Sequence, residues 1–149
     1  MYVKLNGEMV YLWHAVDHEG EILESYVTKK QDRSAALAFM KKALKRHGRA
    51  DVIVTDGLRS YPAAMRHLGN LDRREMGRWL NNRCENSPLG FRRRERAMRR
   101  FRRMKTLQKF ASVHANVSNQ FNLERHLVDR QTFKERRSAA LVEWWATAA

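Results

Sequence analysis

The order of strand-like and helix-like patterns along the chain restricts its fold more than any other feature. Asn6-Gly7 separates two β-rich runs at residues 1–5 and 8–16, and Asn-Gly is a strong signal for a two-residue hairpin. A third β-rich run covers residues 21–28, after a second group of turn residues. The chain therefore begins with three strands that are joined by short turns.

The hairpin also predicts how the first two strands pair. If Asn6-Gly7 closes a two-residue turn, Leu5 faces Glu8 and Met1 faces Leu12. The first residues already have the pattern of a strand, so the sequence is expected to start within a fold.

The hydrophobic period then changes to that of a helix. Asp32 is placed to cap this helix and Gly48 to end it, with apolar residues recurring at helical spacing between them. Residues 51–56 form a short apolar run that ends in Asp-Gly, which indicates a buried strand.

The second half of the chain continues the alternation. A short helix is expected to open at Ser60 and close at Gly69, and a weaker strand is expected around residues 73–79. A helical pattern runs from about Glu85 into the 120s, and a final short helix is expected at residues 139–148. The apolar stripe of the long helix contains five residues: Met98, Phe101, Met104, Leu107 and Phe110.

This order, β-β-β-α-β-α-β-α, predicts an α/β fold in which helices pack against a mixed sheet and the C-terminal half is basic and helical. It is the order of the ribonuclease-H-like fold, in which carboxylates meet at strand ends. This similarity concerns the fold alone and does not determine a function.

Composition indicates the class of partner. The chain has 149 residues, a formal net charge of +14 and a single cysteine, Cys84. A pI near 10.7 favours nucleic acid as a partner, before an anionic membrane surface or a ribosome-like structural role. The sequence contains neither a long apolar run nor a signal-peptide pattern, so we expect one domain over residues 1–149, located in the cytoplasm and not in a membrane.

The positive charge is concentrated in one quarter of the chain. Residues 73–109 hold fourteen Lys and Arg against three acidic residues. Each cation placed on a phosphate releases condensed counterions, so such a run attracts a polyanion. The alternative is a solvated helix face or a contact with an acidic protein. The arginines expected to contact DNA are Arg83, Arg92, Arg93, Arg94, Arg96, Arg99, Arg100, Arg102 and Arg103.

Two carboxylates are candidates for chemistry. Asp56 ends an apolar strand, where ordinary turn bonding is the simpler interpretation. Glu85 lies near a helix start, where a favourable interaction with the helix dipole would also explain it. If the fold brings the two together, they would repel unless a cation such as Mg²⁺ lay between them. A pair of such ions could support phosphodiester chemistry.

These residues and their neighbours resemble a known family. The segments that carry the resemblance occur in family order: Tyr2-Val3-Lys4-Leu5-Asn6-Gly7, Tyr11-Leu12-Trp13-His14-Ala15-Val16-Asp17, Thr55-Asp56, Asn81-Asn82-Arg83-Cys84-Glu85-Asn86-Ser87 and Arg92-Arg93-Arg94-Glu95-Arg96. They resemble the DDE transposases of bacterial insertion sequences, in particular the insertion sequence six family, over nearly the whole chain.

The resemblance implies an integrase-like catalytic domain that cleaves and transfers DNA strands. It implies two Mg²⁺ ions on an Asp-Asp-Glu triad, with Asp56 as the second acid and Glu85 as the third. The partners it implies are the terminal inverted repeats of a transposon, target DNA, and further copies of the chain or a full-length transposase.

The sequence departs from the family pattern in two ways. The family's first catalytic Asp would fall upstream of Met1, as would its helix-turn-helix region, so strand transfer is expected to be lost or severely impaired. Pro88 stands where the family commonly has His. Asp17 does not replace the first acid, because it lies roughly 10 Å further along the strand at about 3.3 Å per residue.

Three functions therefore remain open. The leading hypothesis is a truncated transposase catalytic domain that keeps its affinity for DNA. The second is a non-catalytic DNA-binding module, such as a regulator of full-length transposase. The third is an intact ribonuclease-H-type nuclease, which would need a fourth carboxylate that the sequence does not identify.

Overall fold

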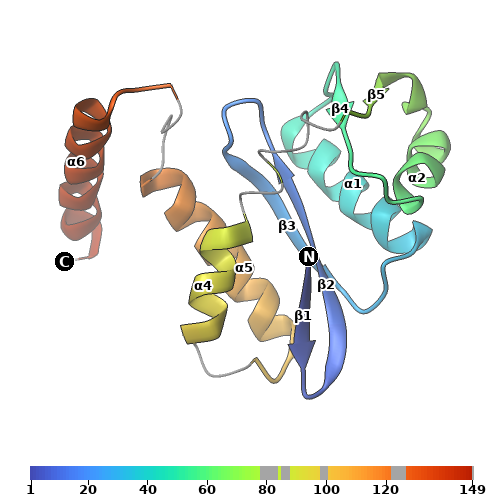
Figure 1. The fold of residues 1–149 in the computed structure, drawn as a ribbon, viewed down its shortest axis with the longest axis horizontal. Coiled ribbons are helices and arrows are strands. Elements are labelled where there is room, and N and C mark those ends of the chain that lie inside the picture. The colour runs from blue at the N-terminus through green and yellow to red at the C-terminus, as the bar shows by residue number, and fades with distance from the viewer. Residues whose placement is uncertain (78–83, 85–87, 98–100, 122–126, 149) are drawn as a thin grey trace.

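The computed structural model describes residues 1–77, 84, 88–97, 101–121 and 127–148. Its strands and helices follow the predicted order (Figure 1). In chain order they are β1 (Tyr2–Leu5), β2 (Glu8–Val16), β3 (Ile22–Thr28), α1 (Arg33–His47), β4 (Ile53–Val54), α2 (Ser60–Leu68), a single 3₁₀ turn η1 (Leu71–Arg73), β5 (Arg74–Glu75), α4 (Pro88–Ala97), α5 (Met104–Phe121) and α6 (Arg130–Ala148).

The first three strands form the antiparallel sheet that the sequence predicts. Asn6 and Gly7 make the turn with positive φ angles of 50° and 91°. Leu5 faces Glu8, and Met1 exchanges two backbone hydrogen bonds with Leu12, so the predicted register is confirmed. The pairing of β1 with β2 ends there, whereas β3 accompanies β2 as far as Val16.

Helices cover both faces of this sheet and divide the core in two (Figure 1). On one face, the cluster under α4 and α5 includes Val3, Leu12 and Phe91. On the other face, Trp13 packs with α1 and α2, and its ring stacks on Phe39 at 5.8 Å. The alternation of Leu12 and Trp13 toward opposite faces follows from the two-residue period of a strand.

The outer edge of β3 is closed by side chains of α5. Gln108 accepts a hydrogen bond from Val27 N and donates one to Ser25 O, both at 2.8 Å. Asn119 does the same for Ile22, at 2.8 and 3.0 Å. These amides satisfy backbone groups that would otherwise offer a free sheet edge.

The ends of the first two helices agree with the sequence. Asp32 Oδ1 accepts a hydrogen bond from Ala35 N at 2.9 Å, so it caps α1, and α1 ends at Gly48 with a φ of 83°. Helix α2 begins at Ser60 and ends at Gly69, which adopts the left-handed conformation.

The expected single mixed sheet is not formed among the described residues. Strand β4 pairs in parallel with β5, and this two-stranded sheet is separate from the antiparallel one. Both strands are only two residues long, so they offer few backbone groups for pairing with a further strand. The finding supports an α/β fold without confirming the ribonuclease-H-like sheet.

The long basic helix of the prediction is two helices, α4 and α5. Phe101 lies between them and is buried in the core, which the break in the helix makes possible. Leu107 is also buried, and Met104 and Phe110 pack against the same cluster, whereas Met98 lies outside the described residues.

The last helix is longer than expected. Asp129 accepts hydrogen bonds from the backbone of Gln131 and Thr132, which starts α6 well before residue 139. This helix lies to one side of the molecule, next to α5 (Figure 1). Among the described residues, no helix is both long and apolar enough to cross a membrane.

Candidate active site

Asp56 lies two residues after the end of β4 and is exposed to solvent. Its Oδ1 accepts a hydrogen bond from Leu58 N at 3.0 Å, so the turn bonding that the sequence suggested is present. Arg74 of β5 holds the same strand end, because its Nε donates to Thr55 Oγ1 at 2.8 Å. Sequence reasoning did not identify Arg74, although it falls within the basic run.

A cleft of about 820 Å³ opens beside this strand end. One wall is the last part of β2 and the other is β4, while Phe39, Met40 and Ala43 of α1 contribute apolar side chains. Asp56, Tyr61 and Cys84 also line it, together with His14 from β2.

Cys84 brings the second motif to this cleft. Its thiol donates to His14 O at 3.5 Å, and it lines the same cleft as Asp56. The next residue, Glu85, lies outside the described residues. The convergence of Asp56 and Glu85 therefore stays a prediction. Cys84, which precedes Glu85, lies on the same side of the molecule as Asp56.

Burial and nearby charges shift the pKa values of several groups around the cleft. Burial lowers the pKa of His14 to about 4, helped by the positive charges of His114 and the chain terminus, and its Nε2 is buried without a hydrogen-bond partner among the described residues. Burial also raises the pKa of Tyr61, and the negative charge of Asp56 adds to this. The pKa of the Met1 amine is lowered by burial first and by Arg92 second, while Asp56 raises it. Met1, Arg92 and Asp56 therefore share one neighbourhood.

Asp56 is the one candidate metal ligand from the sequence that falls within the described residues. Within them, no group of three or more His, Cys, Asp or Glu side chains could hold a metal ion. Asp56 nevertheless fits Mg²⁺ in its chemistry, because it is an exposed carboxylate and Mg²⁺ is commonly held by one or two carboxylates plus phosphate oxygens.

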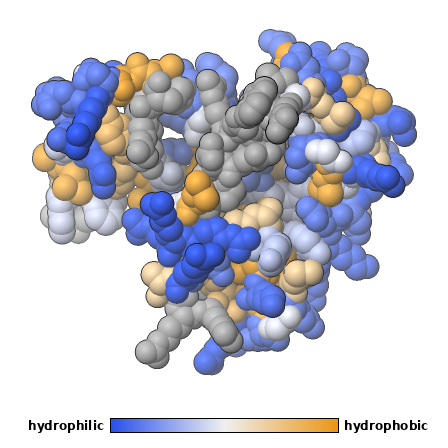
Figure 2. All heavy atoms as spheres, in the orientation of Figure 1, coloured by the Kyte–Doolittle hydropathy of each residue, from blue (hydrophilic) through white to orange (hydrophobic). Residues whose placement is uncertain are grey.

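The predicted DNA-contacting arginines that the structure describes lie on α4 and just after it. Arg93, Arg94 and Arg96 are exposed, as are Arg102 and Arg103. Arg92 is half-buried, with its guanidinium 5.2 Å from the centre of the Tyr2 ring and 3.9 Å from Glu95. Hydrophilic side chains gather over α4 in Figure 2. The predicted contacts Arg83, Arg99 and Arg100 lie outside the described residues.

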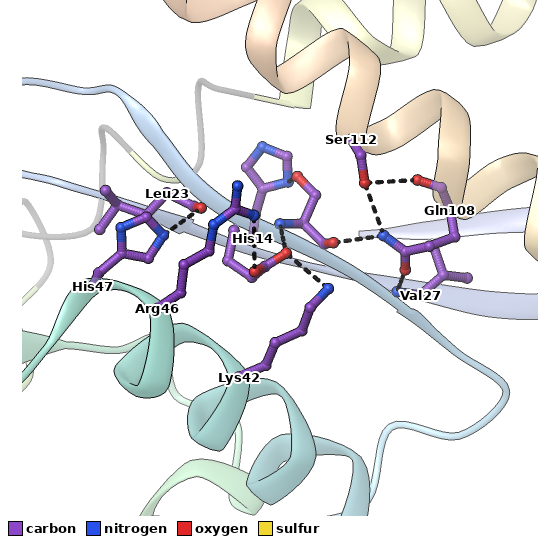
Figure 3. A network of polar contacts seen from close by, with 10 residues as sticks. His14, Leu23, Val27, Lys42, Arg46, His47, Gln108 and Ser112 are labelled. Carbon is purple, nitrogen blue, oxygen red and sulfur yellow. Dashed lines mark hydrogen bonds and ion pairs between the residues drawn. The ribbon is translucent and has the colours of Figure 1, made fainter.

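A buried carboxylate that the sequence did not single out stabilises the sheet. The Glu24 side chain of β3 is 3% exposed and lies 3.1 Å from Lys42 Nζ and 3.7 Å from Arg46 Nη1, both on α1 (Figure 3). Next to this pair, His47 Nε2 bonds to Leu23 O at 2.8 Å. The spacing of Lys42 and Arg46, one helical turn apart, was the available signal.

The comparison with protein families decides what this chain is. A transposase family model described as "DDE domain" matches residues 1–124. The chain belongs to the DDE transposase family. Its relatives place it among the transposases of the insertion sequence six family, as the sequence motifs implied.

Two relatives of this DDE transposase domain come from Staphylococcus aureus. They are the transposase for insertion sequence-like element IS431mec and the transposase for insertion sequence element IS257 in transposon Tn4003. Each is 36% identical to the chain over 64 residues, which is 43% of this chain and 29% of the relative. The match therefore covers less than a third of the length of these transposases.

A third relative is the uncharacterized protein pYV0051 of Yersinia pseudotuberculosis. It is 30% identical over 71 residues, which cover 46% of this chain and 66% of that protein. No solved structure matches the chain.

Proposed function

We propose that this chain is the catalytic domain of a DNA transposase, and that it binds transposon-end and target DNA for strand cleavage and transfer. One observation carries the proposal. The DDE family match includes Asp56, and Asp56 follows β4 in a cleft that also holds Cys84, the residue before Glu85. The ribonuclease-H-like arrangement of the acids belongs to this proposal.

Asp56 and Glu85 would hold Mg²⁺ in this site. When bound, Mg²⁺ would activate an attacking oxygen and stabilise the leaving oxygen in phosphodiester chemistry. Arg74 would keep Asp56 in place through its hydrogen bond to Thr55. The exposed arginines of α4 would lie along the DNA backbone, where they set the register without reading sequence.

A polypeptide of residues 1–149 carries two of the three acids that the family pattern requires. We therefore expect this polypeptide alone to bind DNA and to cleave it poorly. Losing one of three metal-binding acids should remove on the order of several kcal/mol of transition-state stabilisation. A full-length transposase or further copies of the chain would be its protein partners on DNA.

The test is a nicking and joining assay on terminal-inverted-repeat DNA with and without Mg²⁺. Asp56→Ala and Glu85→Gln are compared with Asp51→Ala, which changes an exposed aspartate a few residues before Asp56. We expect at most trace activity that depends on Mg²⁺, is lost in the first two variants and is kept in the third. Robust turnover by the unmodified polypeptide, abolished by Asp56→Ala, would contradict the expected impairment.

The second candidate is a non-catalytic DNA-binding module. The observation that favours it is the exposed arginine face of α4. This candidate predicts salt-sensitive DNA binding that is lost when Arg92–Arg103 is neutralised and unchanged by Glu85→Gln. An effect of Glu85→Gln on Mg²⁺-dependent binding would favour the transposase.

A further inference from the structure

Helix α1 is strongly basic, although it lies outside the segments that carry the family resemblance. The helix contains five Lys and Arg residues and no Asp or Glu. Two of these cations are already occupied inside the molecule, because Lys42 and Arg46 lie beside the buried carboxylate of Glu24. Structural pairing therefore explains only part of the positive charge on this helix.

Three further cations form an exposed row along the end of α1. Lys41 and Lys45 lie one helical turn apart, and Arg49 comes four residues later, just after the C-cap Gly48. None of the three takes part in an ion pair with another residue that the structure describes. We call Lys41, Lys45 and Arg49 the α1 basic surface. Like charges at this spacing repel one another.

The helix dipole does not account for this row. Cations in the last turn of a helix interact favourably with its C-terminal end, which is sufficient to explain Lys45. The effect falls off within that turn, whereas Lys41 lies in the turn before it. The two lysines are about 6 Å apart along the axis at about 1.5 Å per residue, so their ammonium groups can reach separate phosphates. Such a row attracts a polyanion.

The α1 basic surface and the arginines of α4 lie on opposite sides of the molecule. Helix α4 packs on one face of the three-stranded sheet and α1 packs on the other (Figure 1). Lys41 and Lys45 lie on the side of α1 opposite the buried Ala36, so they point away from the sheet. A single duplex would have to bend around the molecule to reach both surfaces. DNA has a persistence length of about 150 bp, so two separate duplexes fit these surfaces better than one.

We propose that the α1 basic surface binds the phosphate backbone of a second DNA duplex, so that one copy of the chain bridges two duplexes. Lys41, Lys45 and Arg49 contact phosphates and therefore hold this duplex without reading its sequence. The bridging rests on the proposed function, because the first duplex is the one expected along α4.

A bead assay with the whole chain measures the bridging directly. One short duplex is immobilised on beads, and a second, fluorescent duplex is retained only when protein connects the two. We expect the unmodified chain to retain the fluorescent duplex, and the triple variant Lys41→Gln, Lys45→Gln, Arg49→Gln to retain at least about tenfold less. The variant Lys41→Arg, Lys45→Arg, Arg49→Lys keeps the charges and should stay within about twofold of the unmodified chain, because phosphate contacts of this kind depend on charge.

Two further measurements locate the loss. In anisotropy titrations, the Gln variant of the α1 basic surface should still bind a single duplex, because α4 is unchanged. A matched variant on α6 removes the same formal charge from exposed positions and should keep the bridging; its substitutions are Arg130→Gln, Lys134→Gln and Arg137→Gln.

Full retention by the α1 Gln variant would overturn the proposal, because bridging would then come from two copies that each bind one duplex through α4. Equal losses in the α1 and α6 variants would also overturn it, since net charge would be the cause. If the unmodified chain binds a single duplex but does not bridge, only the second surface is contradicted. If it binds no duplex in the anisotropy titration, the proposed function is contradicted as well.

Discussion

At the scale of single residues, His14 connects the sheet to the candidate site. Its ring is largely buried, Nδ1 lies 3.3 Å from Ser25 Oγ, and its backbone contacts Cys84. Burial and neighbouring positive charges lower its pKa from 6.5 to about 4, so the folded chain holds it neutral near pH 7. A group whose pKa differs between the folded and unfolded states makes the free energy of unfolding depend on pH.

The sign follows from the two pKa values. Below pH 6.5 the unfolded chain binds a proton at His14 that the folded chain does not bind, so the folded state loses stability as the pH falls toward 4. We expect His14→Gln to remove about 2 kcal/mol of the stability difference between pH 7 and pH 5. Urea unfolding at both pH values measures this difference.

His18 provides the control for this prediction, because its side chain is 87% exposed. His18→Gln should leave the pH dependence unchanged. If the two variants lose the same amount of stability between pH 7 and pH 5, the burial of His14 is not the cause.

At the scale of elements, α5 does more than cover a face of the sheet. Gln108 and Asn119 each bond twice to β3, so the helix both buries apolar side chains and replaces a neighbouring strand at the edge. The outer edge of β3 is therefore closed without a fourth strand among the described residues.

Removing one of these amides should therefore have two effects. Gln108→Leu leaves Val27 N and Ser25 O without their partner, which should cost about 1–3 kcal/mol in the free energy of unfolding. It should also promote association through the exposed edge of β3. Urea unfolding and light scattering measure these effects. Gln120→Leu on the same helix, at an exposed position, should change neither.

At the scale of the whole molecule, local signals in the sequence predicted most elements. Asn6-Gly7 needs positive φ, Asp32 bonds to its own helix, and Gly69 accepts the left-handed conformation, so each acts through nearby backbone. Long-range packing decided the rest. Phe101 lies between α4 and α5 and packs in a cluster that includes Val3 and Val10, which are far away in the sequence.

Motif and charge predicted Asp56 and the arginines as candidate site residues, and the structure places Asp56 in a cleft just beyond β4. Arg74 and Glu24 were missed, because their roles depend on which strand or helix lies beside them. The position of Glu85 relative to Asp56 remains a prediction.

The distribution of charge over the molecule gives a final prediction. Helices α4 and α6 are both basic, but the family match ends at residue 124 and so includes only α4. If α4 lies along DNA, replacing Arg93, Arg94 and Arg96 by Gln should reduce the slope of log affinity against log salt by up to about 3, since each phosphate contact contributes about 0.9.

A matched triple variant on α6 distinguishes a specific contact of α4 with DNA from a general loss of positive charge. Arg130, Lys134 and Arg137 are exposed on that helix, and replacing them by Gln removes the same formal charge. Anisotropy titrations of duplex DNA at several salt concentrations should show a much smaller change in slope for this variant. Equal slopes for the two triple variants would mean that net charge, rather than the position of α4, determines binding to DNA.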